Sequence, residues 1–593
     1  MFTTRPEIAG TFGVVASTHW LASQVGMAVL ERGGNAFDAA VAAAFMLHVA
    51  EPHLNGPGGD APIILHSAAS RRQHVICGQG VSPEAATIAK FEDLDLGLIP
   101  GTGLLPAVVP GAFDAWCLLL RDWGTWALPD VLAFAIGYAR NGIHIVPRIS
   151  AAIATMQPMF ETAWPSSAAV FLPNGKVPAP GSLFARPALA DTYERVLRES
   201  IGPTREARID AARNAWYRGF IAEAVGRFFQ ATDILDTSGR CHRGLLTADD
   251  LSRWSATIED PITYDYHGHS VLKCGAWSQG PVFLQQLALL KDMDIAGLDL
   301  TGAAFVHQVT EAAKLAYADR EAYYGDPDFV TVPLQGLLSD DYNIARRALI
   351  DDTASVQLRP GTIPGYTPIV DHGASARVAL LASNMAGTGE PTVAGLGATG
   401  GDTCHIDVID RFGNMVSATP SGGWLQSSPV IPALGFPMGT RGQMFWLKPN
   451  LPNSLQPNKR PRTTLSPSFA LREGKPWMAF GTPGGEQQDQ WSLIFFLRMV
   501  HHGMGIQQAI DAPSFHSEHW PSSFWPRLAR PGKLVLEGRF DNAVLSDLRM
   551  RGHDASKGED WSEGRLSGAR LEADGQMYAG ANPRGMQGYA VGR

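Results

Sequence analysis

Apolar residues recur at helical spacing in several long stretches of the chain. Residues 21–35, LASQVGMAVLERGGN, carry apolar side chains at that spacing and end at a glycine pair, which is typical of a helix C-terminus. Residues 37–52, FDAAVAAAFMLHVAEP, are almost all small and apolar, a pattern that predicts a helix buried on most sides. Amphipathic spacing continues through most of residues 110–235 and returns over 303–323. We therefore expect many helices before residue 330, and the chain shows no internal repeat.

A period of two residues marks the strands. Residues 401–420, GDTCHIDVIDRFGNMVSATP, predict two short strands joined by a tight turn at 410–414. His405 and Asp407 alternate with Ile406 and Val408, so one face of the first strand is polar. Residues 53–67, HLNGPGGDAPIILHS, predict a glycine-rich loop that leads into a further strand. Another strand pair is expected at about 466–481, followed by a helix and a strand-rich C-terminus.

One long segment lacks any sustained period. Residues 351–402 are rich in Gly, Pro, Thr and Ala, and such a run inside a compact protein is either a linker or functional. It ends where four reactive side chains stand in a row, from Asp402 to His405. This position suggests that the segment serves the chemistry of the strand that follows it.

Composition narrows the class of protein. The 593 residues are 45% hydrophobic and 18% charged, and the net charge of −9 is spread along the chain, which argues against a nucleic-acid partner. No stretch approaches 18 uninterrupted apolar residues, so we expect no membrane span. The five cysteines fit neither a disulfide framework nor a zinc pattern, and the first residues lack a secretory signal. We therefore expect a cytoplasmic protein of enzyme size.

Thr403 is the main candidate for covalent chemistry. Most threonines at the start of a strand are structural, but this one follows a loose segment and begins a strand with a polar face. A threonine hydroxyl is a weak nucleophile that needs an adjacent base. If the chain is cut between Asp402 and Thr403, the freed α-amino group, with a reference pKa of about 7.7–8.0, supplies that base. Attack of the Thr403 hydroxyl on the Asp402 carbonyl would make the cut autocatalytic.

The same stretch resembles the start of the small subunit in the γ-glutamyltransferase family of N-terminal-nucleophile hydrolases. The resemblance extends in collinear order over nearly the whole chain. It is carried by residues 13–52, by EAAKLAYADREAYYGDPDFVTVP (311–333), and by the motifs NKRPRTTLSPS (458–468), GTPGGEQQ (481–488), AIDAPSFH (509–516) and GANPR (580–584).

The resemblance implies roles for individual residues. It makes Thr403 the nucleophile of both self-processing and acyl transfer. It also places hydroxyl groups near the nucleophile or the substrate carboxylate, at Thr419, Ser421, Thr463 and Thr464. Ser421 is expected to position the amine or hydroxyl of Thr403. Gly484 and Gly485 fall at the oxyanion hole, and adjacent glycines before a helix can indeed turn two backbone N–H groups toward a developing oxyanion.

Several positions depart from the family pattern. Gln79, in CGQGVSP, stands where the family has an arginine that holds the substrate α-carboxylate, so a bidentate clamp is lost. Gly423 replaces an expected asparagine, and in QMFWL Gln443 is kept while Trp446 replaces an expected aspartate. A zwitterionic γ-glutamyl group is then not bound in the usual way. Trp424, Phe445 and Trp446 indicate either an aromatic pocket or ordinary core.

Other reactive patterns were weighed against structural explanations. Cys404 and His405 are neighbours on a strand, so their side chains point to opposite faces and cannot pair as in a cysteine protease. His516 and His519 lack a third metal ligand at recognisable spacing. Asp319 and Arg320 are interpreted as a charge pair on a helix.

The sequence predicts an α/β (α+β) protein that is cut from one precursor into a large subunit, 1–402, and a small subunit, 403–593. The resemblance implies that the two form one intertwined unit, a four-layer αββα sandwich, and that no metal or organic cofactor takes part. We expect an amidohydrolase or acyltransferase that acts on a small-molecule amide. Water is favoured over an amine acceptor, because the segment between Gln443 and Pro461 is short for a lid.

Two alternatives stay open. The first is a genuine γ-glutamyltransferase or glutathione hydrolase in which Arg441 or Arg462 replaces the missing clamp. The second is an unprocessed, non-catalytic binding protein. The acyl group, the acceptor and any assembly of identical chains are not fixed by the sequence.

Overall fold

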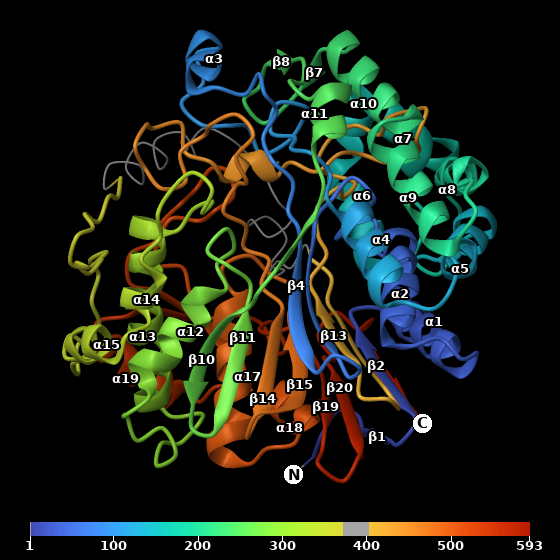
Figure 1. The fold of residues 1–593 in the computed structure, drawn as a ribbon. Coiled ribbons are helices and arrows are strands. Elements are labelled where there is room, and N and C mark those ends of the chain that lie inside the picture. Colours follow the sequence, from blue (N-terminus) through green and yellow to red (C-terminus); the bar gives the residue numbers. More distant parts are fainter. Residues whose placement is uncertain (1, 372–402) are drawn as a thin grey trace.

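The computed structural model describes residues 2–371 and 403–593. Its centre is a pair of seven-stranded antiparallel sheets packed face to face (Figure 1). The first sheet runs in the order β1 (Ile8–Gly10), β20 (Met577–Ala581), β19 (Ser567–Leu571), β15 (Lys475–Gly481), β14 (Ser468–Arg472), β11 (His269–Lys273) and β10 (Ile262–Tyr266). The second runs in the order β21 (Tyr589–Gly592), β2 (Gly13–Ser17), β12 (Ile406–Asp410), β13 (Met415–Ala418), β3 (Ala61–Ser67), β4 (Arg72–Gly78) and β9 (Thr257–Glu259).

The facing sides of the two sheets form a buried apolar layer. Side chains from β2, β12 and β13 of one sheet meet those of β14, β15 and β20 of the other, for example Ile409, Met415, Phe469 and Ala479. A polar contact also crosses the layer, where the Ser417 hydroxyl donates to the Phe480 carbonyl at 3.3 Å. Strands buried on both faces explain the continuous apolar runs in this part of the sequence.

Three helices pack on the outer face of the second sheet, α1 (Trp20–Glu31), α2 (Ala36–Ala50) and α4 (Ala112–Trp123). Further helices lie outside them: α5 (Leu128–Asn141), α6 (Pro147–Thr162), α7 (Pro165–Phe171), α8 (Pro187–Glu199), α9 (Arg205–Tyr217) and α10 (Phe220–Ala231). Helix α2 is buried along its whole length, which its alanines allow by letting neighbouring backbones approach closely. Asn35 and Asp38 form a capping box that fixes where this helix begins.

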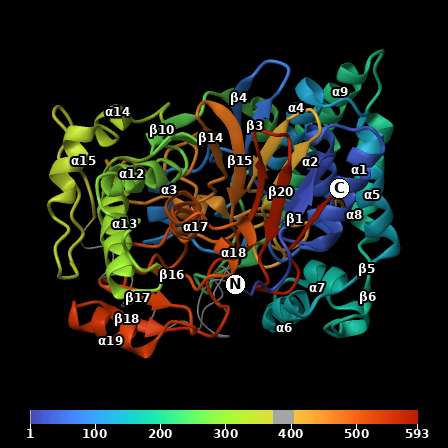
Figure 2. The ribbon, with the colours of Figure 1, turned by 90° about the horizontal axis from the view of Figure 1, so that it is seen from below.

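A second group of helices covers the outer face of the first sheet (Figure 2). It consists of α12 (Pro281–Leu290), α13 (Ala303–Tyr323), α17 (Gln488–His502) and α18 (Ile506–Asp511). The order helix, sheet, sheet, helix is the four-layer sandwich that the sequence predicts, and the elements expected at 20–50, 303–323, 406–418 and 466–481 are present.

Smaller elements lie outside the four layers. They are helices α3 (Ile88–Asp93), α11 (Ala248–Arg253), α14 (Leu334–Leu337), α15 (Asp340–Arg347) and α19 (Asn542–Met550), the strands β16 (Phe515–Ser517), β17 (Lys533–Leu536) and β18 (Asp554–Lys557), and the strand pairs β5 (Ile143–His144) with β6 (Leu183–Phe184) and β7 (Ile234–Leu235) with β8 (Cys241–His242). Residues 351–371 contain no helix or strand. The remainder of the segment expected to be loose, 372–402, lies outside the described residues.

Both predicted subunits contribute to both sheets. In the second sheet, β12 and β13 of the C-terminal part lie between strands of the N-terminal part, and β21 pairs with β2 at the edge. In the first sheet, β1, β10 and β11 of the N-terminal part flank strands of the C-terminal part. The two parts of the chain are therefore intertwined.

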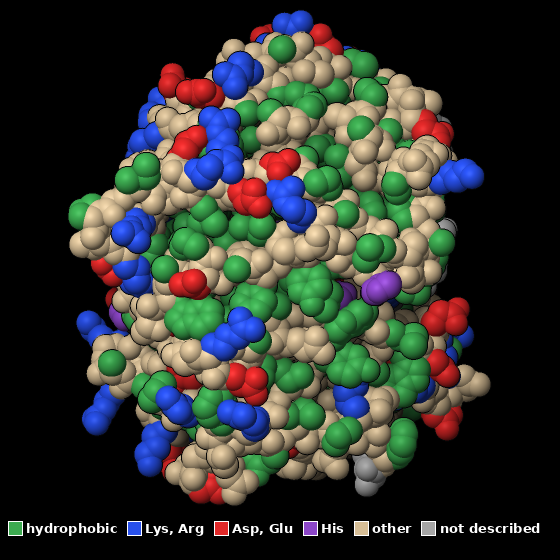
Figure 3. Space-filling model, turned by 90° about the vertical axis from the view of Figure 1, so that its right-hand side faces the viewer, with side chains coloured by type: hydrophobic (Ala, Val, Ile, Leu, Met, Phe, Trp, Pro, Cys, Tyr) green, Lys and Arg blue, Asp and Glu red, His purple; other side chains and the backbone are tan. Residues whose placement is uncertain are grey.

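On the face seen in Figure 3, cationic and anionic side chains are interspersed among apolar ones. Among the helices that the structure describes, none is long and apolar enough to cross a membrane.

Candidate active site

Thr403 lies three residues before β12 and is buried, with 1% of its surface exposed. Its backbone forms an antiparallel bridge with Ser421, and the next amide, that of Cys404, donates to the Pro420 carbonyl at 2.9 Å. One residue further, the His405 carbonyl accepts from the Thr18 amide at the end of β2. The start of β12 is therefore held from both sides by the second sheet.

The Thr403 hydroxyl contacts the hydroxyl of Ser421. Thr403 Oγ1 donates to Ser421 Oγ at 3.2 Å. Ser421 is itself fixed by two backbone hydrogen bonds with Asp60, its amide donating at 3.0 Å and its carbonyl accepting at 2.7 Å. The sequence-based expectation that Ser421 positions Thr403 is consistent with this geometry. Asp402, the other residue of the predicted cut, lies outside the described residues.

The side chains of Cys404 and His405 point in different directions, as expected for neighbours on a strand. Cys404 Sγ donates to Glu51 Oε2 at 3.0 Å, and burial raises the pKa of Glu51. The His405 ring bonds to the Thr419 hydroxyl at 2.9 Å and to Asp407 at 2.9 Å. The thiol and the imidazole do not form a cysteine-protease pair. Thr419, expected near the substrate, has its hydroxyl engaged by His405 instead.

The glycine turn after β15 lies next to the start of β12. A Cβ atom on Gly481, the last residue of β15, would lie 2.4 Å from Cε1 of His405, so the two segments are in close contact. Gly484 has a φ of 129°, a backbone conformation that favours glycine. Thus the residues that lead from Thr403 into β12 and the turn that carries Gly484 and Gly485 lie at the same end of the sandwich.

Side chains fix the direction of the peptide groups in this turn. The Thr482 hydroxyl donates to the Pro483 carbonyl at 2.9 Å, and the Gln488 side-chain amide donates to the Gly484 carbonyl. The C=O and N–H of a trans peptide point in opposite directions, so the amides of Gly484 and Gly485 point away from these side chains. No oxygen atom of residues 2–371 or 403–593 accepts a hydrogen bond from either amide. An unoccupied pair of amides is one of the features that an oxyanion hole requires.

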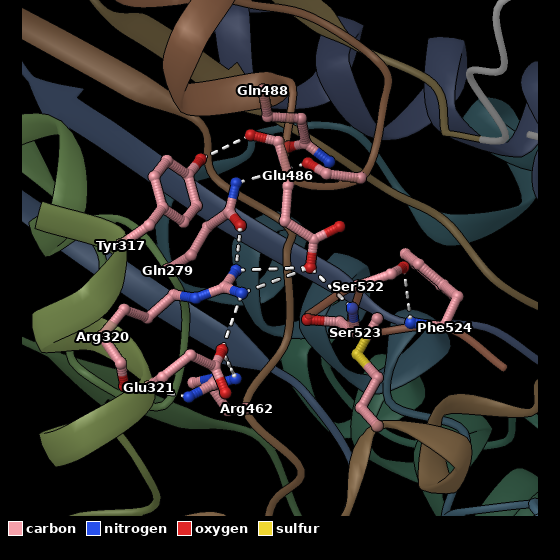
Figure 4. Close-up of polar contacts among 12 residues, drawn as sticks. Gln279, Tyr317, Arg320, Glu321, Arg462, Glu486, Gln488, Ser522, Ser523 and Phe524 are labelled. Atoms are coloured by element: carbon pink, nitrogen blue, oxygen red, sulfur yellow. Dashed lines mark hydrogen bonds and ion pairs between the residues drawn. The ribbon is translucent and has the colours of Figure 1, made fainter. Parts of the chain in front are cut away.

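A buried charged network supports the turn from α13 (Figure 4). Arg320 donates to Gln279 at 3.0 Å, to Glu486 at 3.3 Å and to Glu321 at 2.8 Å. Gln279 in turn donates to the Gly485 carbonyl at 3.3 Å, and the Tyr317 hydroxyl donates to the Glu486 carbonyl. Helix α13 thereby holds the turn that follows β15.

Arg320 corrects an expectation from the sequence. The sequence suggests a charge pair between Asp319 and Arg320, but Asp319 pairs with Arg346 at 3.4 Å, whereas Arg320 pairs with Glu321 at 2.8 Å and with Glu486 at 3.3 Å. The two neighbours therefore have different partners, and the expected pair is wrong. The motifs at 311–333 and 481–488 were both recognised, but their contact across the fold has no signal in either motif.

Two arginines were candidates for replacing the lost carboxylate clamp. Arg462 donates to the Arg320 carbonyl at 2.9 Å and to the Glu321 carboxylate, so its guanidinium is held within the network of Figure 4. Arg441 donates from Nε to Asp60 at 3.2 Å. Gln79, which stands at the clamp position of the family, also donates to Asp60, at 3.4 Å. Burial raises the pKa of Asp60 to about 6, although Arg441 acts to lower it.

Gln443 and Trp446, which were also expected to bind substrate, and the neighbouring Phe445 differ in what they contact. Gln443 is bonded to the Gly101 carbonyl at 3.2 Å and to the Trp525 amide at 3.0 Å. Trp446 stacks on the Arg527 guanidinium, 3.6 Å from ring centre to Cζ, and Phe445 belongs to a small apolar cluster. Phe445 is therefore core.

The two threonines of the NKRPRTT motif lie beside the loop that carries Gln279. The Thr463 carbonyl accepts from the Gln279 amide at 2.9 Å. The buried Thr464 hydroxyl has no hydrogen-bond partner among the described residues.

Histidines elsewhere in the chain have structural partners. His516 bonds to Glu563 at 2.5 Å, and His519 bonds to the Gln357 carbonyl and the Gly532 amide. A separate group that the sequence did not suggest, His307, Glu311 and His553, has metal-ligating atoms within 4.8 Å of one another. Lys314 at 2.6 Å and Arg359 at 3.1 Å already neutralise the Glu311 carboxylate, and both cations oppose the binding of a metal ion.

Residues 22–592 match the model of the family described as gamma-glutamyltranspeptidase. The chain belongs to this family. Two relatives match over nearly their full lengths. A glutathione hydrolase-like proenzyme of Bacillus subtilis (strain 168) is 30% identical, covering 99% of both chains, and an oxamate amidohydrolase proenzyme of Klebsiella pneumoniae is 29% identical, covering 98% of both.

Solved structures share the fold of this gamma-glutamyltranspeptidase family member. The structure titled LmbA2991T421A is 55% identical and covers all of both chains with a TM-score of 0.93. Cephalosporin acylase from Bacillus halodurans is 26% identical with a TM-score of 0.83, covering 100% of this chain and 98% of that one. The sandwich is thus that of the N-terminal-nucleophile hydrolases, as the sequence indicated.

Proposed function

We propose that the chain cuts itself before Thr403 and then uses that residue to hydrolyse an amide bond through an acyl-enzyme. The observation that carries the proposal is the presence of two features at one end of the sandwich: the Thr403 hydroxyl bonded to Ser421 at 3.2 Å, and the glycine turn whose two amides have no acceptor among residues 2–371 and 403–593. The proenzyme names of the relatives support self-processing.

The proposed self-processing is a shift of the Asp402 acyl group from the nitrogen to the hydroxyl oxygen of Thr403. Thr403 Oγ adds to the Asp402 carbonyl carbon, the C–N bond of that peptide breaks, and the hydroxyl proton ends on the released α-amine. Water then hydrolyses the resulting ester, leaving a carboxylate on Asp402 and a free hydroxyl on Thr403. The products are a large subunit, 1–402, and a small subunit, 403–593.

Turnover repeats the same chemistry on a substrate. The α-amine of Thr403 accepts the hydroxyl proton as Oγ attacks the substrate carbonyl, and the amides of Gly484 and Gly485 stabilise the oxyanion. The proton passes to the leaving amine as the C–N bond breaks. Water, or a second amine, attacks the acyl-enzyme and regenerates the hydroxyl. We expect water to be the principal acceptor, and the reaction to take place in the cytoplasm without a metal or organic cofactor.

The substrate is expected to differ from a γ-glutamyl amide. Gln79 occupies the clamp position and is bonded to Asp60, and Trp446, at the expected aspartate, covers Arg527. The oxamate amidohydrolase and cephalosporin acylase among the similar proteins support an amide substrate outside the γ-glutamyl class. A γ-glutamyl enzyme with a substituted clamp and a non-catalytic binding protein are the alternatives.

Trapping the acyl-enzyme tests the proposal. Purified protein is mixed with a panel of small amides, quenched in acid within one turnover and analysed by mass spectrometry. We expect the small subunit to gain the mass of the acyl group on Thr403, with ammonia or amine released in equal amount. Hydrolysis without any adduct on Thr403 in such trapping, or with undiminished rate in Thr403→Ala, would contradict the mechanism.

A further inference from the structure

Arg441 offers a hydrogen-bond donor that no described residue uses. The side chain lies in a short 3-10 turn, Arg441–Met444, and the residue is 2% exposed. Nε donates to Asp60, but the buried Nη2 atom has no acceptor among residues 2–371 and 403–593. Leaving a charged, buried donor unpaired is costly, so such a group indicates a site that is completed by a ligand.

The unpaired nitrogen lies close to the residues that hold the nucleophile. Arg441 Nη2 is 3.6 Å from the position that a Cβ atom on Gly422 would occupy. Gly422 has a φ of 81°, which favours glycine, and it directly follows Ser421, the hydroxyl partner of Thr403. Because residue 422 has no side chain, the space beside this buried nitrogen is not filled by a Cβ atom.

Phe524 connects the same guanidinium with the glycine turn. Its ring centre is 6.0 Å from Arg441 Cζ, and its Cε2 atom is 3.1 Å from the Cβ position of Gly485. Trp424 flanks the guanidinium at 5.5 Å. Aromatic faces stabilise a guanidinium without consuming its N–H donors. Arg441 therefore borders both halves of the proposed site, the nucleophile and the oxyanion hole.

The charges around Arg441 determine which kind of ligand can bind at the unpaired donor, Nη2. Asp60 takes only the Nε side of the guanidinium, and its other oxygen is approached by Gln79 at 3.4 Å and by the Gly80 amide at 3.5 Å. A planar guanidinium has five donors in a fixed fork, and it is suited to carboxylates. A second anionic oxygen can thus bind at Nη2 while Asp60 stays in place.

Resting on the proposed function, we propose that Arg441 binds a carboxylate carried by the acyl part of the substrate. Gln79 is bonded to Asp60 and has no positive charge to offer, so the positive charge is supplied from residue 441. Gly423 and Trp446 offer no partner for an α-ammonium group. The substrate class is therefore the monoamide of a dicarboxylic acid without an α-amino group.

A matched set of amides tests this assignment. Ammonia release is measured with the monoamides oxamate, malonamate, succinamate and glutaramate, and with the corresponding diamides, in which the carboxylate becomes a neutral carboxamide. We expect at least one monoamide to exceed its diamide in kcat/KM by about 100-fold or more, because a site built to bind a group rejects an analogue lacking it. Glutaramate should also match or exceed glutamine, which differs from it by the α-amine alone.

Substitutions test whether Arg441 causes the preference for monoamides over diamides. In the double variant Arg441→Gln, Asp60→Asn, which removes both members of the buried pair together, the monoamide-to-diamide ratio should fall by about 100-fold, toward one. The single variant Arg441→Lys, which keeps a positive charge at this position, should keep part of the monoamide-to-diamide ratio. The control Arg498→Gln, at a buried arginine bonded only to the backbone carbonyls of Ala509, Ala512 and Pro513, should keep the ratio of the unchanged protein.

Four outcomes would overturn the inference. They are diamides hydrolysed as well as monoamides, glutamine strongly preferred to glutaramate, an unchanged ratio in the double variant, and no release from any monoamide by protein that mass spectrometry shows to be cut before Thr403. In the last case the self-cleavage leaves the proposed nucleophile in place, whereas uncut protein would count against the proposed function itself.

Discussion

At the scale of single residues, the site depends on residues that fix the position of the Thr403 hydroxyl. Ser421 is fixed to Asp60 through its backbone and to Thr403 through its side chain, so its hydroxyl has little freedom to turn away. The sequence could name Thr403 and Ser421, because both lie in recognisable motifs near the start of a strand. It could not show that Asp60, more than 340 residues earlier, lies behind Ser421, since that contact depends on the pairing of the whole sheet.

Replacing Ser421 by alanine should slow self-cleavage and turnover by about tenfold to 100-fold, because the Thr403 hydroxyl loses the hydrogen bond that orients it. The measurement is the fraction of cut chain against time, by mass spectrometry. Ser417→Ala is the matched control, since that β13 hydroxyl bonds to the Phe480 carbonyl across the sheets and not to Thr403. Equal rates for the two variants would contradict a positioning role for Ser421.

The ion pair of His516 and Glu563 should make stability depend on pH. Burial alone would lower the pKa of His516, but Glu563 and Glu518 raise it to about 10. A pKa raised on folding stabilises the protein fully below the unfolded value of about 6.5, and this contribution is lost as pH rises toward 10.

We therefore expect the protein without this substitution to have a higher melting temperature than the His516→Gln variant at pH 7. The difference between the two melting temperatures should shrink as pH approaches 10. Thermal unfolding followed by circular dichroism at several pH values measures it. A difference that stays constant from pH 7 to 10 would show that His516 is not held in its charged form.

At the scale of elements, helix α13 and the turn after β15 act together. The sequence predicted the bounds of this helix well, because 21 residues of buried helix leave a strong pattern. The strand pairs at 406–418 and 466–481 were predicted for a similar reason. The interleaved strand order and the contact between Arg320 and Glu486 were not predictable, because nothing local distinguishes a partner 166 residues away from one nearby.

Gln488→Met should lower kcat by about tenfold to 100-fold with little change in KM, because the Gly484 carbonyl loses the donor that aims the Gly485 amide at the oxyanion. The control is Gln286→Met, which replaces a buried glutamine on α12 that bonds to the carbonyls of Val282 and Asp489. Steady-state kinetics on an amide substrate separates the two effects. A rise in KM with unchanged kcat would place Gln488 in substrate binding instead.

At the scale of the whole molecule, the topology joins the two predicted subunits too closely for independent folding. Each seven-stranded sheet contains strands from both sides of residue 402, so separating the parts would expose the apolar layer between the sheets. After cleavage, we expect the two fragments to co-elute from a sizing column in native buffer and to separate only in denaturant. Elution of separate fragments without denaturant would contradict the intertwined arrangement.

The central claim, that Thr403 begins a chain, is tested most directly by the intact mass of the purified protein beside a Thr403→Ala variant. The account predicts two fragments, the smaller starting at Thr403, and a variant that stays whole at 63.7 kDa. An unchanged protein that also stays whole under all conditions, or a variant that is cut at the same bond, would contradict it.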